Sequence, residues 1–218
     1  MTLEDLEQQA QARLLTITAG LDHTACAARQ DLPAGTRTLL LLSPHEPAFW
    51  PGFTAAPEAT DGQPDAMDRW SLRVITDWAT ALGATPLFPF GGPPWAPFVD
   101  WALASGRVHS SPLGMVVHPD AGLFLSFRGA LALRDPVAVP PRCPHPCNNC
   151  PDQPCRTACP VDTFASGLYD VPQCRKHLRS TEGFDCMSKG CAARRACPYG
   201  KSYGRIDAHS AYHMSYFI

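Results

Sequence analysis

The cysteines are the feature that most constrains what this chain can fold into. Nine of its ten cysteines lie within residues 143–197, and only Cys26 lies outside that stretch. An early run contains one Cys-x-x-Cys pair, Cys147 and Cys150, and ends in a Cys-Pro pair at Cys159. A later run ends in a Cys-Pro pair as well. Such a Cys-x-x-Cys pair, with a third cysteine soon after and a fourth followed by proline, is typical of iron–sulfur ligation.

The arrangement resembles that of the bacterial two-cluster ferredoxins, although four residues instead of two separate Cys150 from Cys155. In those proteins the cysteine of each Cys-Pro pair binds the other cluster, because a short loop cannot reach all four corners of a cubane. The resemblance implies two [4Fe-4S] clusters. One takes Cys147, Cys150, Cys155 and Cys197, and the other takes Cys159, Cys174, Cys186 and Cys191, which leaves Cys143 and Cys26 outside both sets.

Two other interpretations of the cysteines stay open. Structural zinc is one, but zinc modules favour two Cys-x-x-Cys knuckles and do not need the Cys-Pro endings. A disulfide framework is the other, and it suits small secreted chains in oxidising compartments. We expect iron–sulfur ligation first, zinc second and disulfides third.

Composition excludes several classes of function. The chain has 218 residues, enough for one medium or two small domains with a sizeable core. Its net charge of −2 gives no support for non-specific nucleic-acid binding. It has no apolar run of membrane-spanning length, and its acidic opening lacks the basic start of a secretory signal. We therefore expect a cytoplasmic protein with no membrane span.

Hydrophobic spacing predicts an α+β fold. Apolar positions with helical period predict helices over Leu3–Ile17 and Asp65–Leu82, each followed by a glycine stop. Short apolar runs predict strands at Leu39–Leu42 and Pro86–Phe90, with an irregular loop over His45–Gly62 between them. A further helix is expected between Pro93 and Gly106, and two short ones near 172–181 and 191–197.

Residues 113–133 are predicted to form a β-hairpin. Two apolar runs flank the turn sequence Pro119-Asp-Ala-Gly122. A proline-rich segment from Asp135 to Pro146 follows and marks a boundary. We therefore expect an α+β domain over 1–139, a small cluster domain over 140–205, and an aromatic tail over 206–218 that packs on the body.

Two family resemblances refine this view. The cysteine half resembles the two-cluster module of epoxyqueuosine reductases, in which an isolated helical cysteine and a final Cys-Pro follow the first set, as Cys174 and Cys197 do here. The first half resembles the cblC-type cobalamin-processing proteins in the segment Met115-Val-Val-His118-Pro119…Arg128-Gly129, with a weaker echo at Asp65–Arg69.

The resemblances imply a nitroreductase-like sheet-and-helix domain followed by a ferredoxin-like domain. They imply that His118 and Arg128 lie near a corrinoid or its reductant, and that the chain is a corrinoid reductase fed by its clusters. A plain ferredoxin-like carrier without a corrinoid and a structural zinc module remain alternatives. Locally basic residues after 170 are also consistent with a redox partner protein, which could be donor or acceptor.

Overall fold

The structure is a computed structural model that describes all residues from Met1 to Ile218. The chain forms two compact units. The first comprises residues 1–108 and 126–143, and the second comprises residues 109–125 and 144–218. Both units mix helices with short antiparallel strands, so the expected α+β class is confirmed.

The first unit is built on a four-stranded antiparallel sheet with strand order β1-β2-β6-β3. The strands are β1 (Leu15–Leu21), β2 (Thr38–Pro44), β3 (Thr85–Leu87) and β6 (Gly129–Leu133). Every residue of β2 and β6 is buried, and each strand contains an unbroken apolar run, Leu39–Leu42 in β2 and Ala130–Leu133 in β6.

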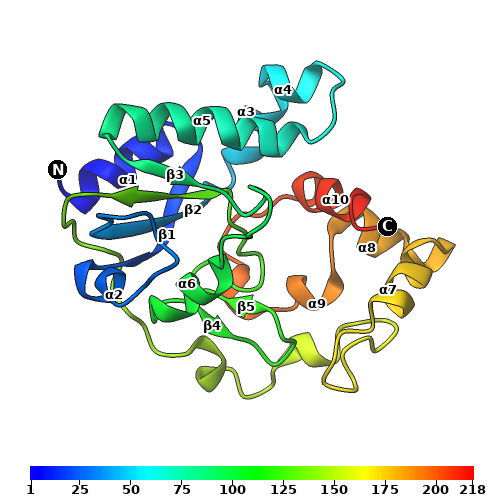
Figure 1. The fold of residues 1–218 in the computed structure, drawn as a ribbon. Coiled ribbons are helices and arrows are strands. Elements are labelled where there is room, and N and C mark those ends of the chain that lie inside the picture. Colours follow the sequence, from blue (N-terminus) through cyan, green and yellow to red (C-terminus); the bar gives the residue numbers. More distant parts are fainter. The chain divides into compact units, whose positions relative to one another are not determined.

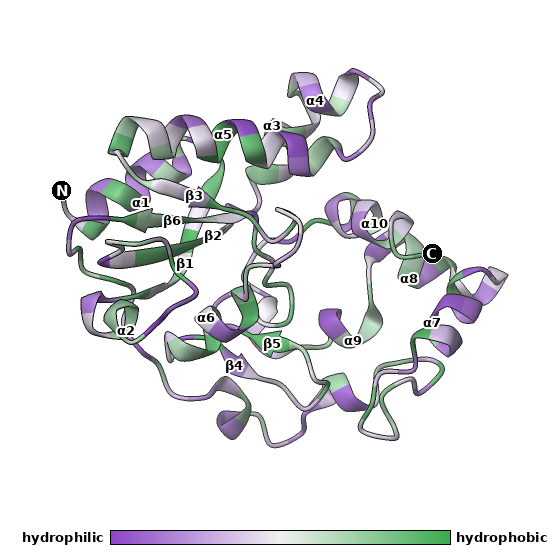
Figure 2. Cartoon of the chain, viewed as in Figure 1, coloured by the Kyte–Doolittle hydropathy of each residue, from purple (hydrophilic) through white to green (hydrophobic).

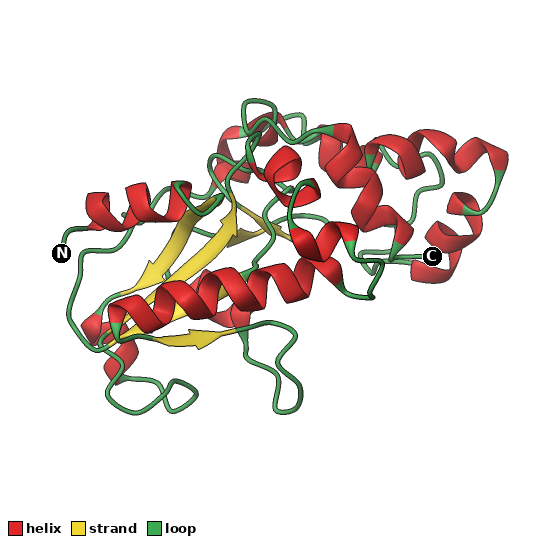
Figure 3. Ribbon diagram, turned by 90° about the horizontal axis from the view of Figure 1, so that it is seen from above, coloured by secondary structure: helices red, strands yellow, loops and turns green.

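Helices cover both faces of this sheet (Figures 1 and 3). α1 (Leu3–Gln11) and α5 (Ala66–Leu82) lie on one side, and α2 (His23–Ala27) and α6 (Phe98–Ala104) lie on the other (Figure 1). The short helices α3 (Phe49–Thr54) and α4 (Pro57–Thr60) precede α5. Figure 2 shows α5 banded in hydrophilic and hydrophobic residues, and its apolar stripe, which includes Ile75 and Trp78, is buried.

The second unit has little regular structure. A two-stranded sheet pairs β4 (His109–Ser110) with β5 (Val116–Val117). The rest is short helices, and the longest of these has nine residues. The 3₁₀ turns are η1 (Pro146–Asn149), η2 (Pro154–Arg156), η3 (Thr181–Gly183) and η4 (Pro198–Gly200), and the α-helices are α7 (Val171–Leu178), α8 (Phe184–Lys189), α9 (Ala192–Arg195) and α10 (Asp207–Ser215). α10 packs against α8.

The prediction of one helix over Leu3–Ile17 is wrong in its second half. α1 ends at Gln11, Leu14 takes a left-handed backbone conformation with φ of 60°, and the chain then enters β1. β-branched residues such as Ile17 favour a strand, and the buried sheet overrides the helical spacing. Gly20 lies inside β1, where a Cβ would be 2.9 Å from the carbonyl oxygen of Leu39, and does not end a helix.

The predicted hairpin over 113–133 is also wrong. The Pro119–Gly122 turn forms, closed by two backbone hydrogen bonds between His118 and Gly122. The segment after it does not return as a strand, and β6 pairs with β2 and β3 in the other unit. Apolar content alone could not tell a hairpin strand from the centre of a different sheet.

Three further expectations have definite outcomes. The segment 45–62 is not a plain loop, because it contains α3 and α4. The helix from Asp65 is confirmed and ends at the predicted Gly83, although Asp65 makes no side-chain cap. The division into units differs from the predicted boundary at 139, since residues 109–125 belong to the second unit. Their apolar side chains are buried among the cysteines there.

Asp31 connects the surface to the interior of the first unit. Its carboxylate accepts a hydrogen bond of 2.9 Å from Nε1 of the fully buried Trp101 and pairs with Arg29 at 2.6 Å. Arg29 above all, and Trp101 to a lesser degree, hold the pKa of Asp31 down at about 2, against its usual 3.8. A carboxyl pKa lowered by folding adds stability above the unfolded-state pKa, and this stability is lost as the pH falls through the folded value.

We therefore predict that Asp31→Asn lowers the free energy of unfolding of the first unit by about 1 kcal/mol at pH 7, after allowance for solvent screening. The difference from the unsubstituted chain should shrink as the pH falls from 4 towards about 2. Denaturant titration followed by tryptophan fluorescence tests this in one unit alone, because all five tryptophans lie in the first unit. The exposed Asp77→Asn is the control. An Asp31→Asn difference that is as large at pH 2.5 as at pH 7 would contradict the prediction.

Candidate metal centres

The ten cysteines are all free thiols. Two of them, Cys26 and Cys143, lie in the first unit, and the other eight lie in the second. Cys26 is buried beside β1, with its thiol 3.5 Å from the carbonyl oxygen of Leu21. The thiol of Cys143 donates to the carbonyl oxygen of Arg107 at 3.3 Å. Both cysteines therefore belong to a different unit from the other eight.

Four of the eight thiols interact as one group, called the first thiol group below: Cys147, Cys150, Cys155 and Cys197. Burial raises the pKa of Cys147, and the neighbouring Cys155, Cys197 and Cys150 raise it further. Burial also raises the pKa of Cys155, again with Cys197 and Cys150 adding to the effect. Cys147 and Cys155 therefore resist ionisation, because burial disfavours the thiolate and a negative charge on a neighbouring thiol opposes it further.

The other four form the second thiol group: Cys159, Cys174, Cys186 and Cys191. Burial raises the pKa of Cys174, a hydrogen bond with Tyr169 opposes this, and Cys191, Cys159 and Cys186 raise it further. Burial likewise raises the pKa of Cys186, against a backbone hydrogen bond from Ala192, and Cys191 adds to the rise. The two groups coincide with the two ligand sets that the ferredoxin resemblance implies.

Short proline-initiated turns set the positions of the first group. Cys147 and Cys155 lie inside η1 and η2, which begin at Pro146 and Pro154. Cys197 is the N-cap of η4, which begins at Pro198. Proline fixes φ near the helical value and lacks the N–H that a first helical position leaves unpaired, so it starts a turn at a defined residue.

Short helices position the second group. Cys174 lies on α7, whose N-cap Asp170 accepts a hydrogen bond of 2.9 Å from the backbone of Gln173. Cys186 lies on α8, and Cys191 is the N-cap of α9. Gly190, with φ of 86°, joins the two helices in a backbone conformation that few other residues adopt.

The segment 109–125 lines the first thiol group. Leu113, Val117 and Leu123 are buried in one cluster with Cys155 and Cys197. This lining was not predicted, because the apolar pattern of the segment placed it in the first domain. The only local signal was the apolar alternation before the turn, which does not say what the side chains pack against. Such an apolar wall keeps water from the thiols and lowers the local dielectric constant.

Gly122 brings the turn into contact with the Cys197 loop. A Cβ at this position would lie 2.4 Å from the backbone nitrogen of Gly200 and 3.0 Å from Sγ of Cys197. The φ of Gly122 is also in the left-handed region, at 55°. Only glycine therefore fits here, for reasons of both space and backbone conformation.

His118 is buried at the start of the same turn, and its Nδ1 accepts backbone hydrogen bonds from Asp120 at 3.1 Å and Ala121 at 3.2 Å. A neutral ring that accepts at Nδ1 carries its proton on Nε2. The Asp120 carboxylate lies 3.8 Å from Nδ1. His118 thus supports the turn that contacts Cys197, whatever else it binds.

Arg128 lies in the first unit, so the structure does not bring the two predicted corrinoid residues together within one unit. Its Nη1 donates to Asp68 of α5 at 3.2 Å, and its backbone N–H donates to Leu42 of β2. Burial raises the pKa of Asp68, and the Arg128 charge opposes that rise. The pair joins two of the segments on which the cblC resemblance rests.

No group of three His, Cys, Asp or Glu side chains in the structure is arranged to hold a single metal ion.

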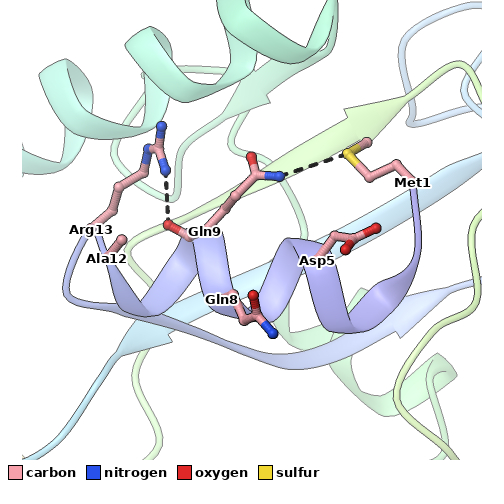
Figure 4. A pocket seen from close by; sticks show the side chains of 6 residues that line it. All are labelled: Met1, Asp5, Gln8, Gln9, Ala12 and Arg13. Atoms are coloured by element: carbon pink, nitrogen blue, oxygen red, sulfur yellow. Dashed lines mark hydrogen bonds between the residues drawn. The ribbon is translucent and has the colours of Figure 1, made fainter.

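A separate hollow beside α1 lacks the features of a reactive site. Figure 4 shows its lining residues, among which Arg13 donates to the Gln9 carbonyl oxygen at 2.9 Å. Its side chains include one carboxylate and one guanidinium but no thiol or imidazole. It carries no functional assignment.

Comparisons of the chain with protein-family models, with curated proteins and with solved structures found no match. None of the helices combines the length and apolar character needed to cross a bilayer. The function must therefore be argued from the site itself.

The close approach at Gly122 yields a matched pair of substitutions. Gly122→Ala should speed amide hydrogen exchange in residues 195–204, because the new methyl group displaces the backbone of Gly200. Gly114→Ala shares the strained backbone, with φ of 72°, but meets nothing within 4 Å. It should cost only about 1–2 kcal/mol and leave exchange in 195–204 unchanged. Equal effects of the two substitutions on that segment would show that the contact is unimportant.

Proposed function

We propose that this chain is an electron-transfer protein that carries two [4Fe-4S] clusters. The first thiol group, Cys147, Cys150, Cys155 and Cys197, would hold one, and the second, Cys159, Cys174, Cys186 and Cys191, the other. A bound cluster of this kind accepts and releases single electrons.

The observation that carries the proposal is the exchange of members between the two cysteine runs. Cys159 belongs to the early run but adds to the rise that burial causes in the pKa of Cys174. Cys197 ends the late run but is buried in one cluster with Cys155, and Cys147 packs against that cluster. A zinc knuckle would pair neighbours in sequence. An exchange of the two Cys-Pro cysteines is the pattern of two-cluster ferredoxins.

The surroundings of the thiols support the same proposal. Ligation requires thiolates, and an isolated buried thiolate is costly, so the raised pKa values suit thiols that ionise only when a cation compensates them. Cations lie nearby as well: Arg156 lowers the pKa of Cys155, and Arg195 lowers that of Cys186, although burial outweighs both. These positive charges would partly neutralise the net negative charge of a ligated cluster. Ten unpaired thiols also suit a reducing compartment, and the cytoplasm is the one we expect.

As the electron acceptor we propose a corrinoid, with the chain acting as a corrinoid reductase. This part rests on the cblC-type and epoxyqueuosine reductase resemblances. With it we propose a nitroreductase-like fold for the first unit and a ferredoxin-like fold for the second. Two contacts support it: the His118–Gly122 turn packs on the Cys197 loop, and Arg128 is fixed by Asp68. The plain electron carrier is the alternative if no corrinoid binds.

Metal content tests the cluster proposal. Anaerobically purified chain should contain about eight irons and eight sulfides. Cys155→Ala should lose about half of both, because it removes one ligand of the first group. Cys143→Ala should lose none, because its thiol lies in the other unit and bonds to Arg107. Equal losses in the two variants would refute the ligand assignment, and zinc without sulfide would replace the proposal with a structural module.

Cobalamin retention tests the acceptor. The anaerobic chain should retain added cobalamin through gel filtration, and its reduced form should take the cobalt from the +3 to the +2 state by one electron. Arg128→Gln should weaken retention, whereas the exposed Arg134→Gln should not. Tryptophan fluorescence should show both variants folded. A chain with full iron content and no retained cobalamin would leave the plain carrier as the function.

A further inference from the structure

The second unit exposes apolar side chains at two places far apart in sequence. Leu168 is 78% exposed and Tyr169 41%, and at the end of the chain Tyr216 is 60% and Ile218 45% exposed. The two places adjoin, because the rings of Tyr169 and Phe217 stack with centroids 6.1 Å apart. We call these five residues the aromatic patch.

The patch is held in place and is not a loose chain end. Phe164 stacks on the inner side of Tyr169, with ring centroids 4.9 Å apart and planes at 16°. Arg175 of α7 donates to the Phe217 carbonyl oxygen at 2.8 Å, and its guanidinium lies 5.2 Å from the ring centroid of Phe217. Contacts of this kind fix side chains and so cost conformational entropy when the chain folds. A surface that is already fixed loses less entropy when a partner binds to it.

The patch lies beside the second thiol group. Arg175, which anchors Phe217, follows Cys174 directly in sequence on α7. Asp170, which follows Tyr169 directly, accepts a hydrogen bond of 3.1 Å from the backbone N–H of Cys174. Tyr169 is thus part of the surface and adjoins a residue that is bonded to a proposed cluster ligand.

The helix that anchors the patch is basic. Arg175 contacts Phe217, and Lys176 and Arg179, on and just after α7, are exposed. We call these three residues the basic rim. Residues 171–195 as a whole carry six basic side chains and two acidic ones. An apolar centre beside charges of one sign suits a small, transient interface, in which the charges steer association and the apolar centre holds the partner briefly.

We propose that the aromatic patch is the docking surface for an acidic one-electron carrier protein, which exchanges electrons with the chain beside Cys174. The inference rests on the proposed function and adds to it the class of partner and the point of exchange. On the proposed function, one electron would pass from the reduced partner to the cluster that the second thiol group would hold, and no covalent bond would form or break.

Binding tests the docking surface separately from electron transfer. The probe is an oxidised plant-type [2Fe-2S] ferredoxin, a small acidic carrier, titrated into the anaerobic full chain in a calorimeter at low ionic strength. The unsubstituted chain should bind it, and binding should weaken steeply with salt. The double variant Leu168→Ser/Tyr216→Ser should weaken binding about tenfold or more, because it removes the apolar centre. Lys176→Glu/Arg179→Glu should do the same by reversing the rim charge.

Matched controls come from the first unit. Leu72 and Val99 are exposed apolar residues, at 49% and 52%, and Leu72→Ser/Val99→Ser should leave binding unchanged. The exposed Arg37→Glu is the charge control. On binding, amide exchange should slow in residues 164–169 and 212–218 of the unsubstituted chain.

Iron and sulfide content, measured for every variant, separates the two proposals. Chain without iron and sulfide would mean that the proposed function fails. Chain with full clusters that does not bind the ferredoxin, or that binds it equally well in patch and control variants, would overturn the docking inference alone. If one of the two patch variants loses its clusters, the binding result of the other variant tests the docking inference, because the two variants change different residues.

Discussion

The second unit depends on the interaction of eight thiols in two groups. Cys155, Cys186 and Cys197 are buried, and the other five are partly exposed. This unit has one two-residue strand pair, and no helix in it exceeds nine residues. Its core cluster includes Cys155 and Cys197 where a larger domain would place leucine or isoleucine. Small chains with so thin a core need cross-links or metal to remain folded. On the proposed function, ligation would join residues as distant in sequence as Cys147 and Cys197, so cluster binding and folding would be coupled.

The first unit is stabilised in a different way. Its sheet is buried under helices, and large side chains such as Trp78, Trp101 and Phe49 fill the interior without exposure. Polar atoms on these rings are satisfied at the edge of the core, as Trp101 is by Asp31 and Trp78 by Gln9. Such a unit can fold by hydrophobic burial alone. The chain therefore combines a scaffold stabilised by packing with a module whose order is expected to depend on metal.

The locations of the site residues were predicted unevenly, and the reason is physical. Ligand spacing is a local property, because turn geometry limits which cysteines can bind the same cluster, so the two ligand sets could be proposed from the sequence alone. His118 and Arg128 were proposed from one stretch of sequence, but they belong to different units. The role of Gly122 beside Cys197 and that of Tyr169 beside Cys174 depend on contacts across the fold, and no local pattern signals them.

The sequence by itself determined the α+β class, the helix that ends at Gly83 and the turn at Pro119–Gly122. These features follow from short-range rules: side-chain period, the conformational limits of glycine and proline, and ligand spacing. Only the tertiary structure decided that residues 15–21 form a strand, that Gly129–Leu133 joins β2 and not the turn before it, and that segment 109–125 lines the thiols. An apolar run does not indicate which distant segment it will pack against. Burial against that segment outweighs the small helix and strand propensities of the individual residues.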